Sequence, residues 1–309
     1  KKIQRDQRQP LKRYWYYPGC STEATAIGLD LSVKAIAKPL GIELIELDDW
    51  TCCGSIPYGS LDKPEAICVA ARNLALAEKK ELDLVTPCAS CFLTLHQANL
   101  QLKNHPQLKA QVNEALAVAN LEYQGNLRTR QFTEVLVNDV TLEVIASKIK
   151  QPLSGLKVAP YYGCQLFRPD YGFDDPEWPQ SLDRLVASLG AEPVPYPLKN
   201  QCCGSSLIIS EESLALELIY RLLNSAAESG AQCITTPCPV CQINLDAYQS
   251  KVNRRFNTNF RLPILFIPQL IGLALGISSK ALGLGTNIVS PKPVLGHILA
   301  VEQEVSSGA

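Results

Sequence analysis

The chain has 309 residues and a formal net charge of −1, and hydrophobic residues make up 46% of it. This length allows a sizeable core and favours two domains over one. The near balance of charge argues against nucleic acid, or a strongly charged substrate, as the main partner of the whole molecule. The first 13 residues differ, because they hold six basic residues against the single acid Asp6. We interpret them as a solvated basic arm, with docking on a partner or an anionic membrane face as the alternative.

No apolar run reaches the roughly 18 residues that a transmembrane helix needs. The nearest candidate, PILFIPQLIGLALGI at residues 263–277, is interrupted by Pro268 and Gln269. We expect a buried core helix there, with an interfacial membrane contact as the alternative. No secretion signal is visible, and because the sequence contains no Met we expect the natural N-terminus to lie upstream. Twelve cysteines without an export signal indicate metal or redox chemistry in the cytoplasm rather than a disulfide framework.

Short apolar runs alternate with helical patterns along the chain. We expect strands at residues 13–17, 42–47, 83–87, 156–162, 192–196 and 232–237, and helices at residues 23–37, 64–79, 181–189 and 211–229. This alternation predicts an α/β fold whose sheets are short, mostly parallel and covered by helices.

The two halves of the chain carry the same motifs in the same order. YYPGC at residues 16–20 corresponds to YYGC at 161–164, and CCGS at 52–55 recurs at 202–205. TPCASC at 86–91 corresponds to TPCPVC at 236–241, again with an offset of 150 residues. A gene duplication explains this pattern and predicts two α/β domains related by a pseudo-two-fold axis.

We divide the chain into five parts: a basic N-terminal arm (1–13), a first domain (14–99), a helical connector (100–152), a second domain (153–277) and a C-terminal tail (278–309). The connector has no clear counterpart in the second half. Its apolar stripe at residues 131–140 indicates packed helices rather than a loose linker. The tail is expected to be irregular.

Ten of the 12 cysteines belong to the repeat: Cys20, Cys52, Cys53, Cys88 and Cys91 in the first half, and Cys164, Cys202, Cys203, Cys238 and Cys241 in the second. They follow predicted strands, so they are expected at the carboxyl edges of parallel sheets, where sites form. Five thiolates together repel one another unless a cation or cluster neutralises them. Structural zinc and ordinary iron–sulfur clusters take four ligands, so five per half indicates an unusual cluster. Zinc-stapled halves and catalytic dithiols remain alternatives.

Other residues carry weaker indications. Gly54 follows the first Cys-Cys pair, and we expect it to adopt positive φ and to let two neighbouring sulfurs approach a metal without a clashing Cβ. Cys68 and Cys233 lie in apolar contexts typical of small core residues. His96 could handle protons five residues after Cys91, with a surface or structurally satisfied histidine as the alternative. No glycine-rich nucleotide motif is present, so electrons are expected to come from another subunit.

These motifs resemble those of the CCG-domain family, and within it the B subunit of heterodisulfide reductase and its relatives, along nearly the whole chain. The FDDPE segment at residues 173–177 narrows the resemblance to the branch that contains this B subunit. The resemblance implies that each half holds one noncubane [4Fe-4S] cluster through its five cysteines. Zinc, or an ordinary iron–sulfur cluster in one half, is the alternative.

The resemblance also implies two possible activities for an electron-transfer subunit of a larger complex. In heterodisulfide reductase the paired clusters split a disulfide in two one-electron steps. In non-classical succinate dehydrogenases a similar subunit replaces the usual membrane anchor and passes electrons to quinone. We favour the second activity because the chain lacks abundant Lys, Glu and Met and has a basic arm. A subunit of lactate or glycolate oxidation, and a non-redox zinc scaffold, are further alternatives.

The favoured activity sets the expected partners and site. It implies an iron–sulfur subunit and a flavoprotein subunit in the same complex, a quinone or disulfide substrate, and peripheral contact with the cytoplasmic face of the membrane. The acceptor is expected between the two halves. Arg168, which follows YYGCQLF, is a candidate charged residue near the second cluster, with a structural ion pair as the alternative.

Overall fold

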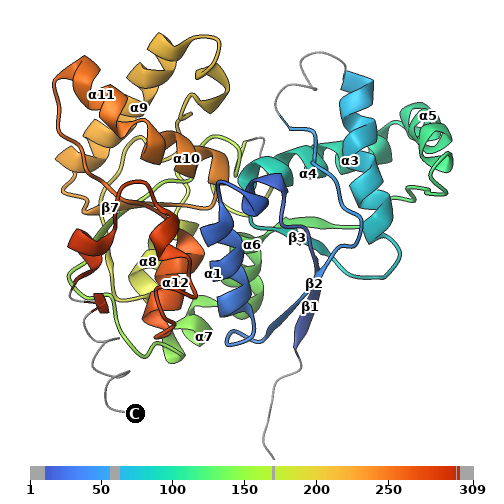
Figure 1. Ribbon diagram of the computed structural model, residues 1–309. Coiled ribbons are helices and arrows are strands. Elements are labelled where there is room, and N and C mark those ends of the chain that lie inside the picture. The colour runs from blue at the N-terminus through green and yellow to red at the C-terminus, as the bar shows by residue number, and fades with distance from the viewer. Residues whose placement is uncertain (1–10, 56–62, 169–170, 297, 300–309) are drawn as a thin grey trace, which may run out of the picture.

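Two four-stranded sheets with the same strand order form the centre of the molecule (Figure 1). The computed structural model describes residues 11–55, 63–168, 171–296 and 298–299. The first sheet has the order β2-β1-β3-β4 and the second has the order β6-β5-β7-β8. Every pairing in both sheets is parallel. The predicted duplication of an α/β domain with parallel sheets is therefore confirmed.

The strands are short. They are β1 (Lys12–Tyr16), β2 (Ile42–Glu46), β3 (Leu84–Thr86), β4 (Thr129–Gln131), β5 (Lys157–Pro160), β6 (Glu192–Pro193), β7 (Cys233–Thr236) and β8 (Ile264–Phe266). In the register, Tyr14 of β1 lies beside Leu44 of β2, and Val158 of β5 lies beside Cys233 of β7. The six strands expected from the sequence are all present, and β4 and β8 were not expected.

Helices cover both sheets. In the first half they are α1 (Ile27–Ala37), α3 (Lys63–Ala77), α4 (Ala89–Asn104), α5 (Pro106–Ala117), α6 (Phe132–Glu134) and α7 (Leu142–Ser147). In the second half they are α8 (Ser181–Ser188), α9 (Glu212–Glu228), α10 (Pro239–Ala247), α11 (Gln249–Phe256) and α12 (Ile267–Ala274). A π-helix (Val135–Val140) follows α6, and the 3₁₀ turns η1 (Cys20–Glu23), η3 (Ser205–Leu207) and η4 (Leu284–Thr286) complete the set.

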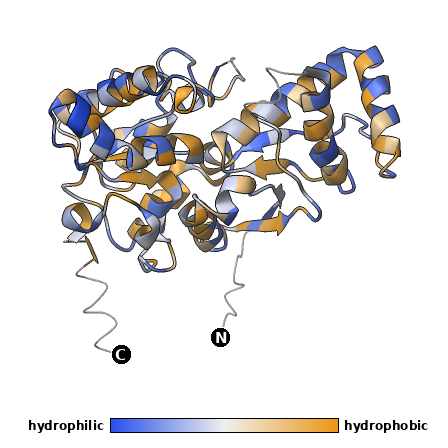
Figure 2. Cartoon of the chain, turned by 45° about the horizontal axis from the view of Figure 1, so that its top comes forward, coloured by the Kyte–Doolittle hydropathy of each residue, from blue (hydrophilic) through white to orange (hydrophobic). Residues whose placement is uncertain are grey.

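Strand β1 separates two hydrophobic cores because its side chains alternate between the faces of the sheet. Tyr14 and Tyr16 belong to a core that extends through the second half. Trp15 and Tyr17 belong to a smaller core that includes residues of α3, α4 and α5. In Figure 2 the central strands are mostly hydrophobic, whereas the outer helices are mixed.

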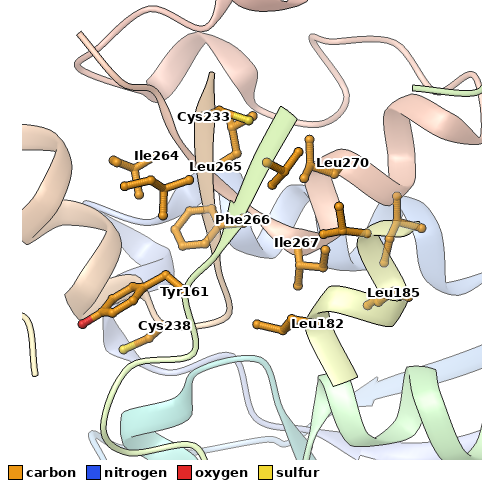
Figure 3. Close-up of a cluster of buried hydrophobic side chains, with 14 of the residues drawn as sticks. Tyr161, Leu182, Leu185, Cys233, Cys238, Ile264, Leu265, Phe266, Ile267 and Leu270 are labelled. Atoms are coloured by element: carbon orange, nitrogen blue, oxygen red, sulfur yellow. The ribbon is translucent and has the colours of Figure 1, made fainter. Parts of the chain in front are cut away.

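The halves are held together by helices that pack across the duplication. Helix α12 of the second half lies beside α1 of the first half, and α7 of the first half contacts α8 of the second (Figure 1). All eight residues of α12 are buried, as expected for a helix that is apolar on every side. Figure 3 shows Ile267 and Leu270 of α12 in one cluster with Leu182 and Leu185 of α8.

Three expectations about individual segments need correction. Residues 12 and 13, assigned to the basic arm, form the start of β1, where Arg13 pairs with Glu43 at 3.0 Å; residues 1–10 lie outside the described part. The connector at 100–152 contains β4, which is the fourth strand of the first sheet, so this segment has a counterpart in β8. The apolar segment at 263–277 forms a strand followed by a helix rather than one helix. The domain boundaries themselves stay a prediction.

The described part of the C-terminal tail is packed rather than irregular. The buried carboxylate of Asp246 accepts hydrogen bonds from the backbone N–H groups of Ile288 and Val289. Residues 292–296 are helical, and Leu295 is fully buried. None of the helices in the described ranges is long and apolar enough to cross a membrane.

Candidate metal centre

In each half the cysteines follow the carboxyl ends of three neighbouring strands of the sheet. In a sheet of order 2-1-3-4, the chain leaves β1 and β3 in opposite directions, and ligands commonly bind outside the strand ends at this point. Cys20 follows β1, the pair Cys52 and Cys53 follows β2, and Cys88 and Cys91 follow β3. The second half repeats this placement after β5, β6 and β7.

In the first half the five sulfurs form one chain of neighbours. The Sγ atoms of Cys20 and Cys52 are 3.7 Å apart, and those of Cys53 and Cys91 are 3.5 Å apart. The side chains of Cys52 and Cys53 hydrogen-bond to each other, as do those of Cys91 and Cys88. The order of contact is therefore Cys20, Cys52, Cys53, Cys91 and Cys88.

The second half repeats most of these contacts with equivalent residues, but its two consecutive cysteines, Cys202 and Cys203, interact through charge. The Sγ atoms of Cys203 and Cys241 are 3.5 Å apart. Cys164 hydrogen-bonds to Cys202, and Cys241 to Cys238, through their side chains. The structure thus gathers all ten predicted site cysteines into two groups of the same design.

The two sulfur chains approach each other at Cys88 and Cys238. A hydrogen bond from Cys91 lowers the pKa of Cys88, but burial and the charge of Cys238 outweigh it, and the pKa is raised overall. The turn η1, which carries Cys20, also contacts α10, which begins after Cys238. Figure 3 shows Cys238 and Tyr161 near each other, and both belong to the larger of the two cores. The inner ends of both sites therefore lie in one region between the halves.

Each site has an exposed edge and a buried edge. Cys20, Cys52 and Cys202 are exposed, whereas Cys53, Cys88, Cys91, Cys203, Cys238 and Cys241 are buried. In a buried group of thiols, neighbours stabilise one thiolate by donating hydrogen bonds to it. Hydrogen bonds with Cys52 and Cys91 lower the pKa of Cys53 to about 3, and the hydrogen bond with Cys164 lowers the pKa of Cys202 to about 6.

A buried tyrosine holds each Cys-Cys loop in place. The hydroxyl of Tyr17 donates to the backbone oxygen of Thr51 at 2.6 Å, and that of Tyr161 donates to the backbone oxygen of Gln201 at 2.7 Å. Thr51 and Gln201 immediately precede their cysteine pairs. Burial, aided by nearby cysteine charges, raises the pKa of both tyrosines, so their hydroxyls remain hydrogen-bond donors.

Gly54 was expected to leave room for sulfur, but in the structure other glycines of the motifs do so. Gly54 has φ 79°, as predicted, but a Cβ there would lie 3.2 Å from Val69 of α3 and not against sulfur. The expected clash with sulfur occurs instead at Gly19 and Gly163, where a Cβ would lie 2.9 Å from Cys91 Sγ and 3.2 Å from Cys241 Sγ. Gly54 therefore allows the loop to pack on a helix, and Gly19 clears the space beside the sulfurs.

The surroundings of the two sites differ in charge. Beside the exposed Cys20 and Cys52 runs a groove lined by acidic residues: Glu23, Glu46, Asp48 and Asp49. In the second half the position equivalent to Asp49 is Lys199, which is 3% exposed and lies 3.2 Å from Asp183. The backbone oxygen of Lys199 accepts hydrogen bonds from Tyr162 and Gly163, just before Cys164. The repeated sulfur chains therefore lie in unequal electrostatic settings.

The two candidate catalytic residues, His96 and Arg168, both contact other side chains of the protein. His96 packs against Phe92 and against Tyr171 of the second half, and its Nδ1 lies 3.2 Å from Thr129 Oγ1. Burial lowers the pKa of His96. The guanidinium of Arg168 pairs with Glu177 at 2.9 Å within the same loop.

Several residues that shape the site were not expected from the sequence. Tyr17 and Tyr161 hold equivalent positions three residues before Cys20 and Cys164, so aligning the repeats on these cysteines reveals them. Thr86 and Thr236 each accept a hydrogen bond through Oγ1 from the N–H of the following cysteine, Cys88 or Cys238, at 3.4 and 3.3 Å. Within the described ranges, no three His, Cys, Asp or Glu side chains form a compact ligand set for a single metal ion. The thiols form an extended chain instead.

Comparison with known proteins identifies the repeat. The family model "CCG: Cysteine-rich domain" matches residues 14–96 and 158–246. The 8-methylmenaquinol:fumarate reductase membrane anchor subunit of Wolinella succinogenes is 40% identical over 280 residues, which are 90% of this chain and 97% of that protein.

Other relatives carry a different activity in their names. The B subunit of the ferredoxin/F(420)H(2)-dependent CoB-CoM heterodisulfide reductase of Methanosarcina acetivorans is 33% identical, covering 94% of this chain and 97% of that protein. A protein of Archaeoglobus profundus, named for its likeness to the B subunit of heterodisulfide reductase, is 35% identical, covering 87% and 92%.

The fold also matches a solved structure. A hypothetical protein from Helicobacter pylori superposes with a TM-score of 0.75 at 20% sequence identity. That match covers 91% of this chain but 52% of the solved chain, so this protein spans about half of its length. On the family match and the relatives together, the chain belongs to the CCG cysteine-rich domain family, in the branch that contains the B subunit of heterodisulfide reductase.

Proposed function

We propose that this protein is the iron–sulfur electron-transfer subunit of a multi-subunit oxidoreductase linked to quinone. The observation that carries the proposal is the pair of five-cysteine groups, one in each half, which are close enough that the charge of Cys238 raises the pKa of Cys88. Two one-electron centres side by side suit an acceptor that takes up two electrons. The membrane anchor subunit of 8-methylmenaquinol:fumarate reductase, 40% identical to this chain, supports quinone as that acceptor.

The ten cysteines are the proposed ligands of two noncubane [4Fe-4S] clusters, one in each half. Soft thiolate donors suit iron–sulfur clusters, and each half brings five thiols to one place, several of them in direct sulfur contact. Bound there, the clusters would supply one-electron transfer. Gly19 and Gly163 leave room beside the sulfurs, and the tyrosine hydroxyls fix the Cys-Cys loops.

In the proposed complex the two electrons and two protons that convert a quinone to a quinol have separate sources. Succinate oxidation on a flavoprotein subunit supplies the electrons, which an iron–sulfur subunit relays to this chain. The protons come from water at the exposed side of the site. Since quinones reside in membranes, the protein is expected to act at the cytoplasmic face of the membrane as a peripheral component.

Reduction of a thiol-cofactor heterodisulfide is the second candidate, because two B subunits of heterodisulfide reductases match over almost the same length at 33% and 34% identity. A disulfide also takes up two electrons, and its two sulfurs leave as thiols after two protons are added. The same paired sites serve either acceptor.

The native complex, purified without oxygen, tests the proposal. We expect it to contain a flavoprotein and an additional iron–sulfur subunit, about eight iron atoms in this chain, and reduction of menadione with succinate. Zinc in place of iron would instead identify a scaffold. Co-purification of subunits that reduce a heterodisulfide, with no turnover of menadione, would establish the second candidate.

A further inference from the structure

A cavity of about 270 Å³ lies beside the Cys-Cys-Gly-Ser turn of the first half. Its lining starts at Gly54 and Ser55, directly after Cys53, and continues along α3 and α4. One residue of the second half, Gln165, joins it directly after Cys164. The cavity therefore touches residues adjacent to proposed ligands of both clusters.

The walls combine apolar side chains with three side-chain amides. Ile67, Leu93 and three alanines supply apolar surface. The hydroxyls of Ser55 and Ser90 are 2.9 Å apart, and Thr94 donates to the backbone oxygen of Ser90 at 3.0 Å.

Three glutamines complete the lining: Gln97, Gln101 and Gln165. Within the part of the chain that the structure describes, their side-chain amides form no hydrogen bond. An amide can donate through nitrogen and accept through oxygen, so these groups can bind a polar ligand atom.

Charge distinguishes between the two candidate acceptors. No described residue of the lining is charged. An anionic ligand, such as a dicarboxylate or a disulfide of charged thiols, would lose its hydration there without gaining a basic partner. A neutral, flat ring with carbonyl oxygens fits this chemistry, because the apolar walls contact the ring and the amides donate to the carbonyls.

In the second half, larger side chains stand at positions equivalent to lining residues of this cavity. At the offset of 150 residues, Ala70 and Ala98 of the lining correspond to Tyr220 and Tyr248. Tyr220 stacks on Phe256 with ring centroids 4.3 Å apart, and Lys251, the counterpart of Gln101, lies over the ring of Tyr248. The duplication therefore retains five cysteines in each half, whereas the residues that line this cavity in the first half have bulkier counterparts at two positions of the second.

We propose, as an extension of the quinone-linked function, that this first-half cavity binds the ring of a quinone, with amides of Gln97 and Gln101 donating to a carbonyl oxygen. Its volume lies just below the ~300–1,000 Å³ of typical ligand pockets, so it holds the ring and not a whole lipid. The site belongs to the first half, with Gln165 as the one contribution from the second.

Filling the cavity with the residues that the other repeat uses tests this assignment. Menadione binding is measured by anaerobic titration calorimetry on the iron-loaded full chain. A70Y and A98Y are expected to weaken binding at least about ten-fold, equivalent to ~1.4 kcal/mol, with iron content and cluster spectra unchanged. The matched control is L100Y, which adds the same ring at an exposed position of α4 outside the lining and should bind menadione normally.

A second pair of variants covers the case in which a tyrosine prevents folding. Q97L and Q101L keep the side-chain size and remove the amides, and each is expected to weaken binding roughly 2- to 10-fold, as for one lost hydrogen bond. Unchanged binding in all four variants would overturn the cavity assignment while leaving the quinone function intact. If the unmodified chain binds no menadione and the complex reduces only a disulfide, the proposed function itself fails.

Discussion

The hydroxyl of Tyr17 and the backbone oxygen of Thr51 form a 2.6 Å hydrogen bond that ties β1 to the first Cys-Cys loop. Replacing Tyr17 with Phe removes this donor and leaves a carbonyl inside the protein without its partner. We expect Y17F to lose about 1 kcal/mol of stability and to release iron from the first half faster than the unmodified chain when a chelator is added.

The duplication supplies the matched experiment. Y161F removes the equivalent 2.7 Å bond to Gln201, so it should destabilise the second half and leave the spectrum of the first unchanged. Equal release of iron from both halves in either variant would contradict independent anchoring by the two tyrosines.

Replacing Gly19 with alanine tests whether the sulfurs of the first half need the space that this glycine leaves. Its backbone has φ 85° and ψ 151°, a conformation that only glycine adopts easily, and an added Cβ would lie 2.9 Å from Cys91 Sγ. G19A should cost roughly 1–3 kcal/mol and reduce the iron content of the first half, measured after anaerobic reconstitution. G41A is the control, because Gly41 has φ 77° but nothing within 4 Å of the added Cβ. It should be destabilised while retaining full iron.

The sequence predicted the part of this site that repeats. The motifs that recur in both halves predicted the grouping of the cysteines, six of the strands, and the position of the cysteines at the ends of those strands. Strands β4 and β8 escaped prediction because each has three residues, too few to show a period, and because the apolar residues of β8 continue into the buried helix α12.

Other features depended on packing between distant segments. The sequence indicated that Gly54 needs positive φ, but only the structure shows that its neighbour is Val69 and that Gly19 faces the sulfur. The aligned repeats contain a sign of the first-half cavity, because Ala70 and Ala98 correspond to the larger residues Tyr220 and Tyr248. The sequence alone does not show that these alanines line a cavity, because this depends on how α3 and α4 pack against each other.

His96 gives the stability of the protein a pH dependence. Burial lowers its pKa below the ordinary value of 6.5, so below that value the unfolded chain binds more protons than the folded one. The stabilisation that comes from burying neutral His96 is fully present above about pH 6.5, and it decreases as the pH falls toward the lowered pKa of the folded state. We expect the thermal midpoint to fall between about pH 7.5 and about pH 5.5, and to fall less in H96F. H105F, at an exposed position, should behave like the unmodified protein.

Lys199 should make the second cluster easier to reduce than the first. Its buried ammonium pairs with Asp183 and lies over the ring of Trp178, with the centroid 4.6 Å away. Removing a positive charge near a redox centre disfavours the reduced state, so K199Q is expected to lower the reduction potential of the second-half cluster in an EPR-monitored titration.

Breaking this ion pair also affects stability. Because Asp183 is 26% exposed, the loss in K199Q should be roughly 2 kcal/mol, below the ~3–5 kcal/mol of a fully buried pair. K199R keeps the charge and should retain the potential even if its packing is poorer. A potential that falls equally in K199R and K199Q would attribute the effect to packing and not to charge.

Single serine substitutions determine whether the two sulfur chains hold separate clusters. Cys53 and Cys203 occupy equivalent central positions, each 3.5 Å from its Cys-x-x-Cys partner. C53S is expected to lose the first proposed cluster and C203S the second, so each variant should retain about half of the iron if each half holds the proposed four-iron cluster. C233A is the control, because Cys233 lies in the core, where burial raises its pKa to about 12, and belongs to neither chain. The charge of Cys238 is felt at Cys88, so a further result is expected: loss of one cluster should slightly shift the spectrum of the other, because the electric field there changes. Loss of all iron in either single variant would instead show that the ten cysteines form one cooperative site.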